Sequence, residues 1–117
     1  MRDDGWTEEF PAAITVCDEQ GVILSMNRAA GEVFRKDGGR SLVGKSLLGC
    51  HPEPARTLLA DLLKNPRVNT YIVEKGKVKK LIHQAPWYRA GRCAGFVELS
   101  IVLPENMAHH VRKESKS

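Results

Sequence analysis

Short runs of aliphatic residues at the start of the chain predict strands. Residues 14–17 and 22–26 are rich in β-branched and aliphatic side chains, and they flank the turn sequence Asp-Glu-Gln-Gly. Asp18 can hydrogen-bond to the backbone that follows it, and Gly21 can adopt the positive φ that closes a tight turn. The two runs therefore predict a β-hairpin.

The spacing of apolar residues then changes to that of helices. Asn27 is a good N-cap, because its side-chain oxygen can accept from the unpaired N–H groups of a helix start. A short apolar face follows at helical spacing, made by Ala29, Ala30, Val33 and Phe34. A second helix is predicted after the Pro-Glu-Pro sequence of residues 52–54, since proline suits a first helical turn. Its apolar stripe comprises Ala55, Leu58, Leu59, Leu62 and Leu63.

The last third of the chain returns to strand patterns. Residues 68–74, 77–88 and 93–103 predict three strands, separated by Lys-Gly and Ala-Gly turns. Period-two counting places Leu81, His83, Ala85 and Trp87 on one face of the second of these strands. In the third, the same counting places Val97, Leu99, Ile101 and Leu103 on one face, and Glu98 and Ser100 on the other.

Five short motifs in this order resemble those of PAS domains, the small sensory and dimerisation modules of signalling proteins. They are Asp-x-x-Gly (18–21), Asn-x-Ala-Ala (27–30), Val-Gly-Lys (43–45), His-Pro-Glu (51–53) and Ala-Pro (85–86). The resemblance covers residues 12–104. It implies an α+β fold with the element order β-β-α-α-α-β-β-β, in which helices cover one face of a five-stranded antiparallel sheet.

Segments on either side complete the expected organisation. Residues 1–11 form a leader in which Trp6 and Phe10 share a face if the segment is helical, which predicts an amphipathic cap. Residues 105–117 are polar, and in PAS proteins this position often begins a connector helix to an output domain. The chain is therefore interpreted as a domain excised from a longer protein, with a free-standing module as the alternative.

Composition narrows the class of protein. With 117 residues and 42% hydrophobic residues, the chain is long enough for one domain with its own core. Cys17, Cys50 and Cys93 are widely spaced, which argues against a disulfide framework or a four-cysteine zinc site. No signal peptide or membrane-spanning run is recognisable, so we expect a cytoplasmic location without membrane association. The net charge of +4 and the lysines at residues 75–80 accompany no nucleic-acid-binding motif, so direct nucleic-acid binding is not expected.

Enzyme signatures are missing from the sequence. It contains no Gly-x-Ser-x-Gly elbow, P-loop or dinucleotide-binding glycine pattern. We therefore expect no catalysis.

A small-molecule pocket between the long helix and the sheet is the expected functional site. The residues predicted to line it are Phe34, Leu48, Leu59, Leu63 and Tyr71, with His83, Trp87 and Ser100 as aromatic or polar contacts. A filled core without a ligand is the alternative.

A more specific hypothesis than an unidentified small molecule is haem binding at the Cys-His-Pro sequence of residues 50–52. Haem needs an axial His or Cys beside an apolar cavity, and some PAS domains bind it near the long helix. A PAS subgroup found beside haemerythrin-like domains shares Cys-His-Pro here, which makes Cys50 or His51 the candidate ligand and His83 a second one. The plainer interpretation is that His51 belongs to the common His-Pro-acid helix start. Flavin is not expected, because the Asn-Cys-Arg-Phe-Leu-type motif of light-sensing PAS domains is missing.

The resemblance thus predicts a sensory domain in signal transduction or transcriptional regulation. A small ligand or partner would favour one of two arrangements, and the change would pass through the last strand to an output domain in cis. A homodimer is expected, through the leader and the exposed sheet face. The alternatives are a haem-dependent gas or redox sensor and a ligand-free dimerisation module.

Overall fold

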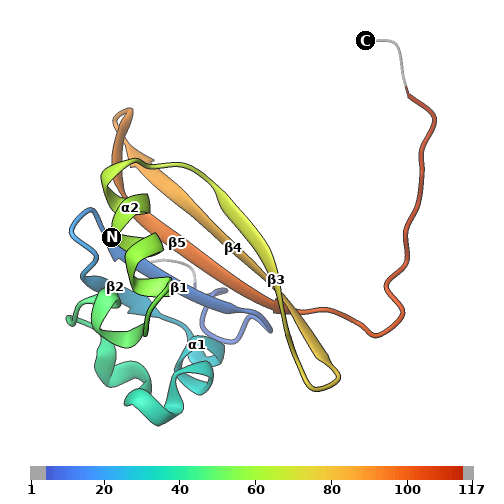
Figure 1. Ribbon diagram of the computed structural model, residues 1–117, viewed down its shortest axis with the longest axis horizontal. Coiled ribbons are helices and arrows are strands. Elements are labelled where there is room, and N and C mark those ends of the chain that lie inside the picture. The colour runs from blue at the N-terminus through green and yellow to red at the C-terminus, as the bar shows by residue number, and fades with distance from the viewer. Residues whose placement is uncertain (1–4, 115–117) are drawn as a thin grey trace.

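A computed structural model describes residues 5–114 and shows a five-stranded antiparallel sheet of order β2-β1-β5-β4-β3 (Figure 1). The alternating and aliphatic runs form these strands, so the predicted fold class is confirmed. The strands are β1 (Ala13–Asp18), β2 (Ile23–Met26), β3 (Asn69–Lys75), β4 (Val78–Arg89) and β5 (Arg92–Val102).

Helices cover one face of this sheet (Figure 1). The α-helices are α1 (Arg28–Val33) and α2 (Ala55–Lys64), with the 3₁₀ helices η1 (Arg35–Asp37), η2 (Gly39–Leu42) and η3 (Leu47–Cys50) between them. The sequence predicted three α-helices, whereas residues 5–114 contain two and three short 3₁₀ turns. Gly38 has φ +116°, a left-handed conformation that ends η1 and prevents a longer helix from forming.

The β1–β2 hairpin forms as its turn sequence predicts. The Asp18 Oδ1 atom accepts hydrogen bonds from the backbone N–H groups of Gln20 and Val22, each at 2.9 Å. Gly21 has φ +84°. The side chain of Asp18 therefore organises the turn.

Asn27 holds three segments together. Its Oδ1 atom accepts from the N–H of Ala30, which caps α1, and from the N–H of Ile14 in β1, both at 3.0 Å. Its Nδ2 group donates to the carbonyls of Thr7 and Ala12, at 2.9 and 2.8 Å. Both amide hydrogens and the oxygen are used, so the side chain is satisfied although it is buried.

The described part of the leader folds differently from the predicted cap helix. Residues 5–9 form bends and turns. The rings of Trp6 and Phe10 still meet, edge to face with centroids 5.6 Å apart, and both side chains are exposed. Residues 103–114 contain no helix or strand and run away from the sheet (Figure 1). Leader residues 1–4 and tail residues 115–117 lie outside the described part of the chain.

The core lies between the helices and the β2-β1-β5 part of the sheet. Ile23, Leu62 and Cys17 are its largest fully buried side chains. Leu62 comes from the apolar stripe of α2, and Cys17 comes from β1. Where β5 passes β1, a Cβ atom on Gly95 would overlap the carbonyl oxygen of Cys17, so only glycine fits there.

Candidate functional site

A row of polar residues crosses the sheet face that the helices cover. Strand register places Thr15 of β1 opposite Glu98 of β5, Glu98 opposite Gln84 of β4, and Gln84 opposite Asn69 of β3. These four residues form the polar row, and their sheet face is called the inner face. The polar row lies next to the apolar core, so buried members such as Thr15 and Gln84 lie close to apolar side chains.

Hydrogen bonds link the row from strand to strand. The Asn69 Nδ2 group donates to Gln84 Oε1 at 2.8 Å, and the Gln84 Nε2 group donates to Glu98 Oε1 at 2.9 Å. Gln84 is only 4% exposed. A buried amide is tolerated because its donor and acceptor atoms are both partnered.

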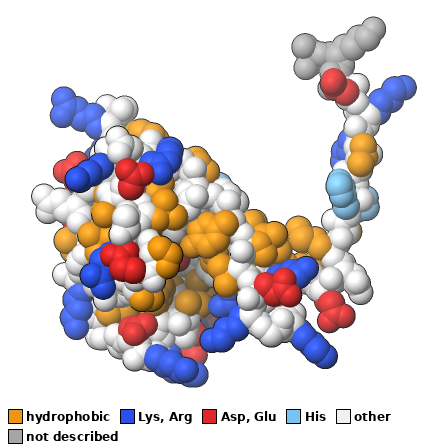
Figure 2. All heavy atoms as spheres, in the orientation of Figure 1, with side chains coloured by type: hydrophobic (Ala, Val, Ile, Leu, Met, Phe, Trp, Pro, Cys, Tyr) orange, Lys and Arg blue, Asp and Glu red, His pale blue; other side chains and the backbone are white. Residues whose placement is uncertain are grey.

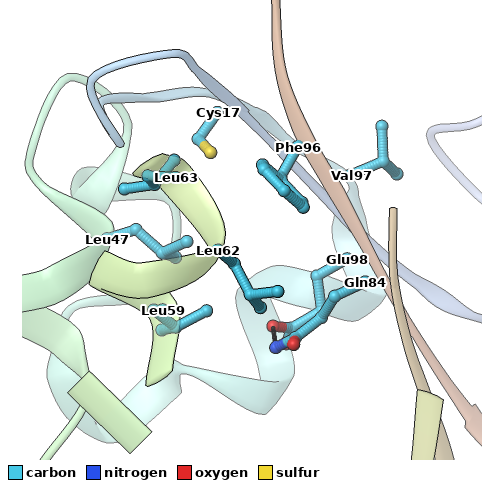
Figure 3. Close-up of a pocket in the computed structure, with 9 residues that line it drawn as sticks. All are labelled: Cys17, Leu47, Leu59, Leu62, Leu63, Gln84, Phe96, Val97 and Glu98. Carbon is cyan, nitrogen blue, oxygen red and sulfur yellow. Dashed lines mark hydrogen bonds between the residues drawn. The ribbon is translucent and has the colours of Figure 1, made fainter. Parts of the chain in front are cut away.

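A small cavity lies between the polar row and α2 (Figure 3). Its volume is about 10 Å³, enough for roughly one water molecule. Figure 3 shows Leu59 and Leu63 of α2 on one side, the ring of Phe96 facing them, and the bonded Gln84–Glu98 pair at the edge. It is lined by Cys17, Leu47, Leu59, Leu62, Leu63, Gln84, Phe96, Val97 and Glu98.

Six of the predicted pocket residues lie on the helix-covered side of the sheet. Leu59 and Leu63 line the cavity itself. Phe34 and Leu48 are half-buried and pack against the neighbouring core without lining it. The register places Tyr71 and Ser100 on the inner face, in the row after the polar row, on either side of Ile82.

His83 and Trp87 are instead on the outer face, so their predicted place in the pocket is wrong. The register puts His83 opposite Leu99, and its Nδ1 atom lies 2.8 Å from the hydroxyl of Thr70. Trp87 follows on the same face, where its Nε1–H donates to the carbonyl of Cys17 at 3.0 Å. Period-two counting grouped these residues correctly, but it cannot say which face the helices cover.

The sequence analysis missed the residues that give the cavity its polar edge, Gln84 and Glu98. Glu98 stands between Val97 and Leu99, and such an alternation usually indicates a polar side chain that faces solvent. Here the apolar side chains of Val97, Leu99 and Ile101 lie on the outer face. The register of β4 and β5 shifts by one residue between Trp87 and Tyr88, so counting back from the Ala-Gly turn does not place Gln84 opposite Glu98.

Cys50 and His51 lie at the end of η3 and do not line the cavity. The His51 Nδ1 atom lies 3.0 Å from the carbonyl oxygen of Leu47, so this nitrogen carries the hydrogen in that bond. The imidazole also packs edge-on against Phe34, with ring centroids 6.0 Å apart. The ring of His51 thus packs at the end of η3, and its part in binding stays a prediction.

Haem does not fit these residues in this arrangement. The enclosed cavity has about 10 Å³, whereas pockets for organic ligands have roughly 300–1,000 Å³. Burial, and secondarily the carboxylate of Asp37, raises the pKa of the Cys50 thiol, which disfavours the ligating thiolate. Among residues 5–114, no group of three or more His, Cys, Asp or Glu side chains could hold a metal ion.

Two further pKa shifts describe the electrostatics of the interior. Burial is the main cause that raises the pKa of the Cys17 thiol, which therefore behaves as a small apolar side chain. Burial, followed by the charge of Glu98, raises the pKa of Tyr71. Both side chains therefore keep their protons to a higher pH than they would in solvent.

Membrane-spanning helices are not found in the described residues, where no helix is long and apolar enough.

Comparison with curated proteins gave no significant match. Solved structures do resemble the chain. The sensor region of a sensor histidine kinase has a TM-score of 0.59 at 20% sequence identity. The match covers 77% of this chain but only 38% of the sensor region, so the chain spans less than half of that protein's length.

Two further solved structures have similar scores. The PAS domain of BvgS from Bordetella pertussis has a TM-score of 0.59 at 22% identity, with coverage of 84% of this chain and 81% of that one. The Aer2 receptor from Vibrio cholerae, described as a dual PAS-heme oxygen sensor, has a TM-score of 0.56 at 18% identity, with coverage of 80% and 95%. At these identities the similarity shows the fold. The sequence profile of the PAS fold matches residues 7–105, and the chain therefore belongs to the PAS family.

Proposed function

We propose that this PAS domain senses a small molecule bound between α2 and the polar row and relays its presence to a signalling partner. The observation that carries the proposal is the Asn69–Gln84–Glu98 hydrogen-bond chain beside a small apolar cavity. A ligand with a hydrogen-bond donor would be recognised by the carboxylate of Glu98, and its apolar part by the leucines of α2. PAS domains are sensory modules and usually not enzymes, which agrees with this role.

Binding would require α2 to move, because the cavity holds no more than about one water molecule. The ligand would therefore stabilise an arrangement in which α2 lies farther from the sheet, and it would shift the population toward that arrangement. Strand β5 carries Glu98 and leads directly to Val102 and the extended tail. A change at Glu98 can thus reach residues 103–114 and an output domain in cis.

The experiment is native mass spectrometry of the purified domain, followed by hydrogen–deuterium exchange. A co-purified small molecule should appear as an added mass in the parent protein and be lost in Gln84→Leu. Removing it should raise exchange in α2 and in residues 98–103. The proposal would be contradicted if the parent protein showed only the mass of its polypeptide and if its hydrogen–deuterium exchange did not change after incubation with cell-extract metabolites. That result would favour a ligand-free module.

A homodimerisation module is the second candidate function, and the outer sheet face is the observation that favours it. No helix within residues 5–114 covers this face (Figure 1), and its apolar side chains are half-buried. A groove of about 340 Å³ lies between them and the leader, near Ile14, Val16 and Thr7. The outer face carries Ile14, Val16, Leu81, Val97, Leu99 and Ile101. Sedimentation should show a dimer that Leu99→Glu dissociates and that the outward substitution Val111→Glu in the tail leaves intact.

Haem sensing is the candidate that the geometry supports least. An absorption spectrum before and after addition of haemin tests it directly. A Soret band that is lost in His51→Ala would overturn the assignment of His51 to packing. The proposed setting of the domain is cytoplasmic signal transduction or transcriptional regulation, without direct contact to nucleic acid or membrane.

A further inference from the structure

Strand β3 lies at one end of the sheet and pairs on one side only. Its seven residues pair with β4, from Asn69 opposite Gln84 to Lys75 opposite Val78. In the strand order β2-β1-β5-β4-β3, no described strand lies on its other side. The hairpin of β3 and β4 also extends past the helices (Figure 1). One edge of β3 is therefore open for pairing with another chain.

The middle of this edge lacks the features that usually prevent pairing. Residues 69–73 read Asn-Thr-Tyr-Ile-Val and contain no charge and no proline. Charges occur only at Glu74 and Lys75, where the strand ends. Tyr71 and Ile72 are 40% and 59% exposed, on opposite faces of the strand. An uncharged, exposed edge of this length is a template for strand addition.

Apolar side chains continue from this edge onto the inner face, beyond the reach of α2. Val73 and Val102 lie on either side of Lys80 in one cross-strand row, and Val78 lies in the next. Together with Tyr71 these valines form the open patch, in which each side chain is at least 40% exposed. Figure 2 shows hydrophobic side chains gathered from the region of α2 to the start of the extended tail.

Positive charge gathers on the hairpin that carries the open patch, where Lys75 and Lys80 share its face. The β3–β4 hairpin carries Lys75, Lys77, Lys79 and Lys80, with Glu74 as its single acid. Within residues 5–114, none of these lysines forms an ion pair, because the four ion pairs found involve arginines only. The hairpin thus has a local excess of positive charge that favours an anionic partner.

We propose that β3 is a docking edge for an extended acidic segment of a partner protein. The segment would pair with β3 as a sixth strand, place alternate apolar side chains on the open patch and bring its carboxylates to the hairpin lysines. Backbone pairing would provide affinity, and the charge would select the partner. This interaction surface is separate from the proposed ligand site and does not depend on it.

A second copy of the chain is a poorer occupant of this edge. If two β3 strands paired antiparallel with Ile72 at the centre, Lys75 would lie opposite Asn69 of the second copy. The hairpin turn that follows Lys75, with Lys77, would then come near the residues that precede β3 in the second copy, among them Arg67. Cations would thus gather at both ends of the paired strands, and like charges brought together across a strand pair are destabilising.

The test uses a fluorescent blocked peptide of sequence Asp-Glu-Val-Thr-Val-Thr-Val-Glu-Asp and the full chain, with binding measured by anisotropy. Saturable binding is expected, and Lys77→Glu with Lys79→Glu should weaken it by about tenfold or more. The matched control, Lys36→Glu with Lys45→Glu, makes the same charge change away from the hairpin and should alter affinity by less than about twofold. Equal losses in the two double variants would overturn the proposal, because the attraction would then depend on net charge alone.

Backbone pairing is tested with two N-methylated forms of the peptide. One is methylated on the N–H groups of odd residues and the other on those of even residues, so each blocks a different peptide edge. One form should lose binding while the other retains it, and amide resonances of residues 70–73 should shift in NMR spectra. Equal binding of both forms, or no binding of the parent peptide, would overturn the proposal. So would a dimer in sedimentation that the peptide dissociates, because β3 would then serve a second copy.

Discussion

Strand β5 passes through two contrasting ends of the same sheet. At the covered end, beneath the helices, Phe96 is 7% exposed, whereas Val102 at the open end is 62% exposed. Both side chains lie on the inner face and follow the same alternation. What differs is the presence of α2 above one of them. The alternating pattern thus decides which residues share a face, and only the packing of another element decides whether that face becomes core.

This contrast suggests a division of roles along the sheet. The covered end contains the fully buried side chains Ile23, Leu62 and Cys17 and should provide most of the stability. The open end has few buried apolar groups and is free to contact other molecules. The polar row lies at the boundary between them.

The largest effect is expected from Leu62→Ala in the covered end. Leu62 is 1% exposed, and its truncation should reduce the free energy of unfolding by about 3 kcal/mol. The matched change at the open end, Ile72→Ala, should cost less than about 0.5 kcal/mol. Urea denaturation measures both. Similar decreases in unfolding free energy for the two variants would show that the two ends are equally important for stability and would contradict the proposed difference between them.

The next largest effect is expected at Asn27, which joins the leader to the covered end. Asn27→Asp keeps the acceptors for Ile14 and Ala30 but removes both donors to the carbonyls of Thr7 and Ala12. A loss of about 2 kcal/mol in unfolding free energy is expected. Thermal unfolding of this variant beside Asn106→Asp in the tail provides the comparison. Equal stability of the two variants would show that the leader bonds contribute nothing.

A smaller effect is expected in the polar row. Gln84→Leu leaves Asn69 and Glu98 without their partner and should cost about 1–2 kcal/mol. Asn69→Ala removes only the end of the chain of hydrogen bonds, at a less buried site, and should cost less. Chemical denaturation of both variants would locate the boundary between covered and open ends. A larger loss for Asn69→Ala would move that boundary into β3.

The smallest effect concerns the ion pair that precedes β3. Hydrogen bonds from Arg67, which lies 2.7 Å from Asp61, and from Asn65 lower the pKa of the Asp61 carboxyl. Because the pKa is lower in the folded state, the stability it provides is present above the ordinary value of about 4 and is lost as the pH falls through the folded value. Arg67→Ala should raise the pKa of Asp61 in an NMR titration, whereas Arg35→Ala should not. An unchanged pKa of Asp61 in Arg67→Ala would show that the ion pair with Arg67 does not stabilise the folded state.

Much of the fold could be predicted because its signals are local. The Asp18 turn, the Asn27 cap and the leucine stripe of α2 each depend on residues close in sequence. The inner face could not be assigned in the same way. Gln84 and Glu98 are fourteen residues apart and meet only through the pairing of β4 and β5, and neither pattern shows which face α2 covers.

The candidate site shows the same difference between residues with local signals and residues placed by strand pairing. Leu59 and Leu63 line the cavity because a helix presents its apolar stripe to whatever it covers. His83 and Trp87 were placed wrongly because aromatic and imidazole side chains suggested a binding site, whereas the register puts them on the outer face. The ligand role of all these residues remains a prediction.

The hydrogen bonds of Asn27 also determine what must be kept when the domain is moved between proteins. Because its amide donates to the carbonyl of Thr7, the folding unit begins before β1, and the profile of the family likewise begins at residue 7. A recombination event or an engineered fusion that joined a new sequence at residue 12 would leave one amide hydrogen of a buried side chain without its acceptor. Successful chimaeras should therefore carry the short leader with them, and their junctions should fall upstream of it.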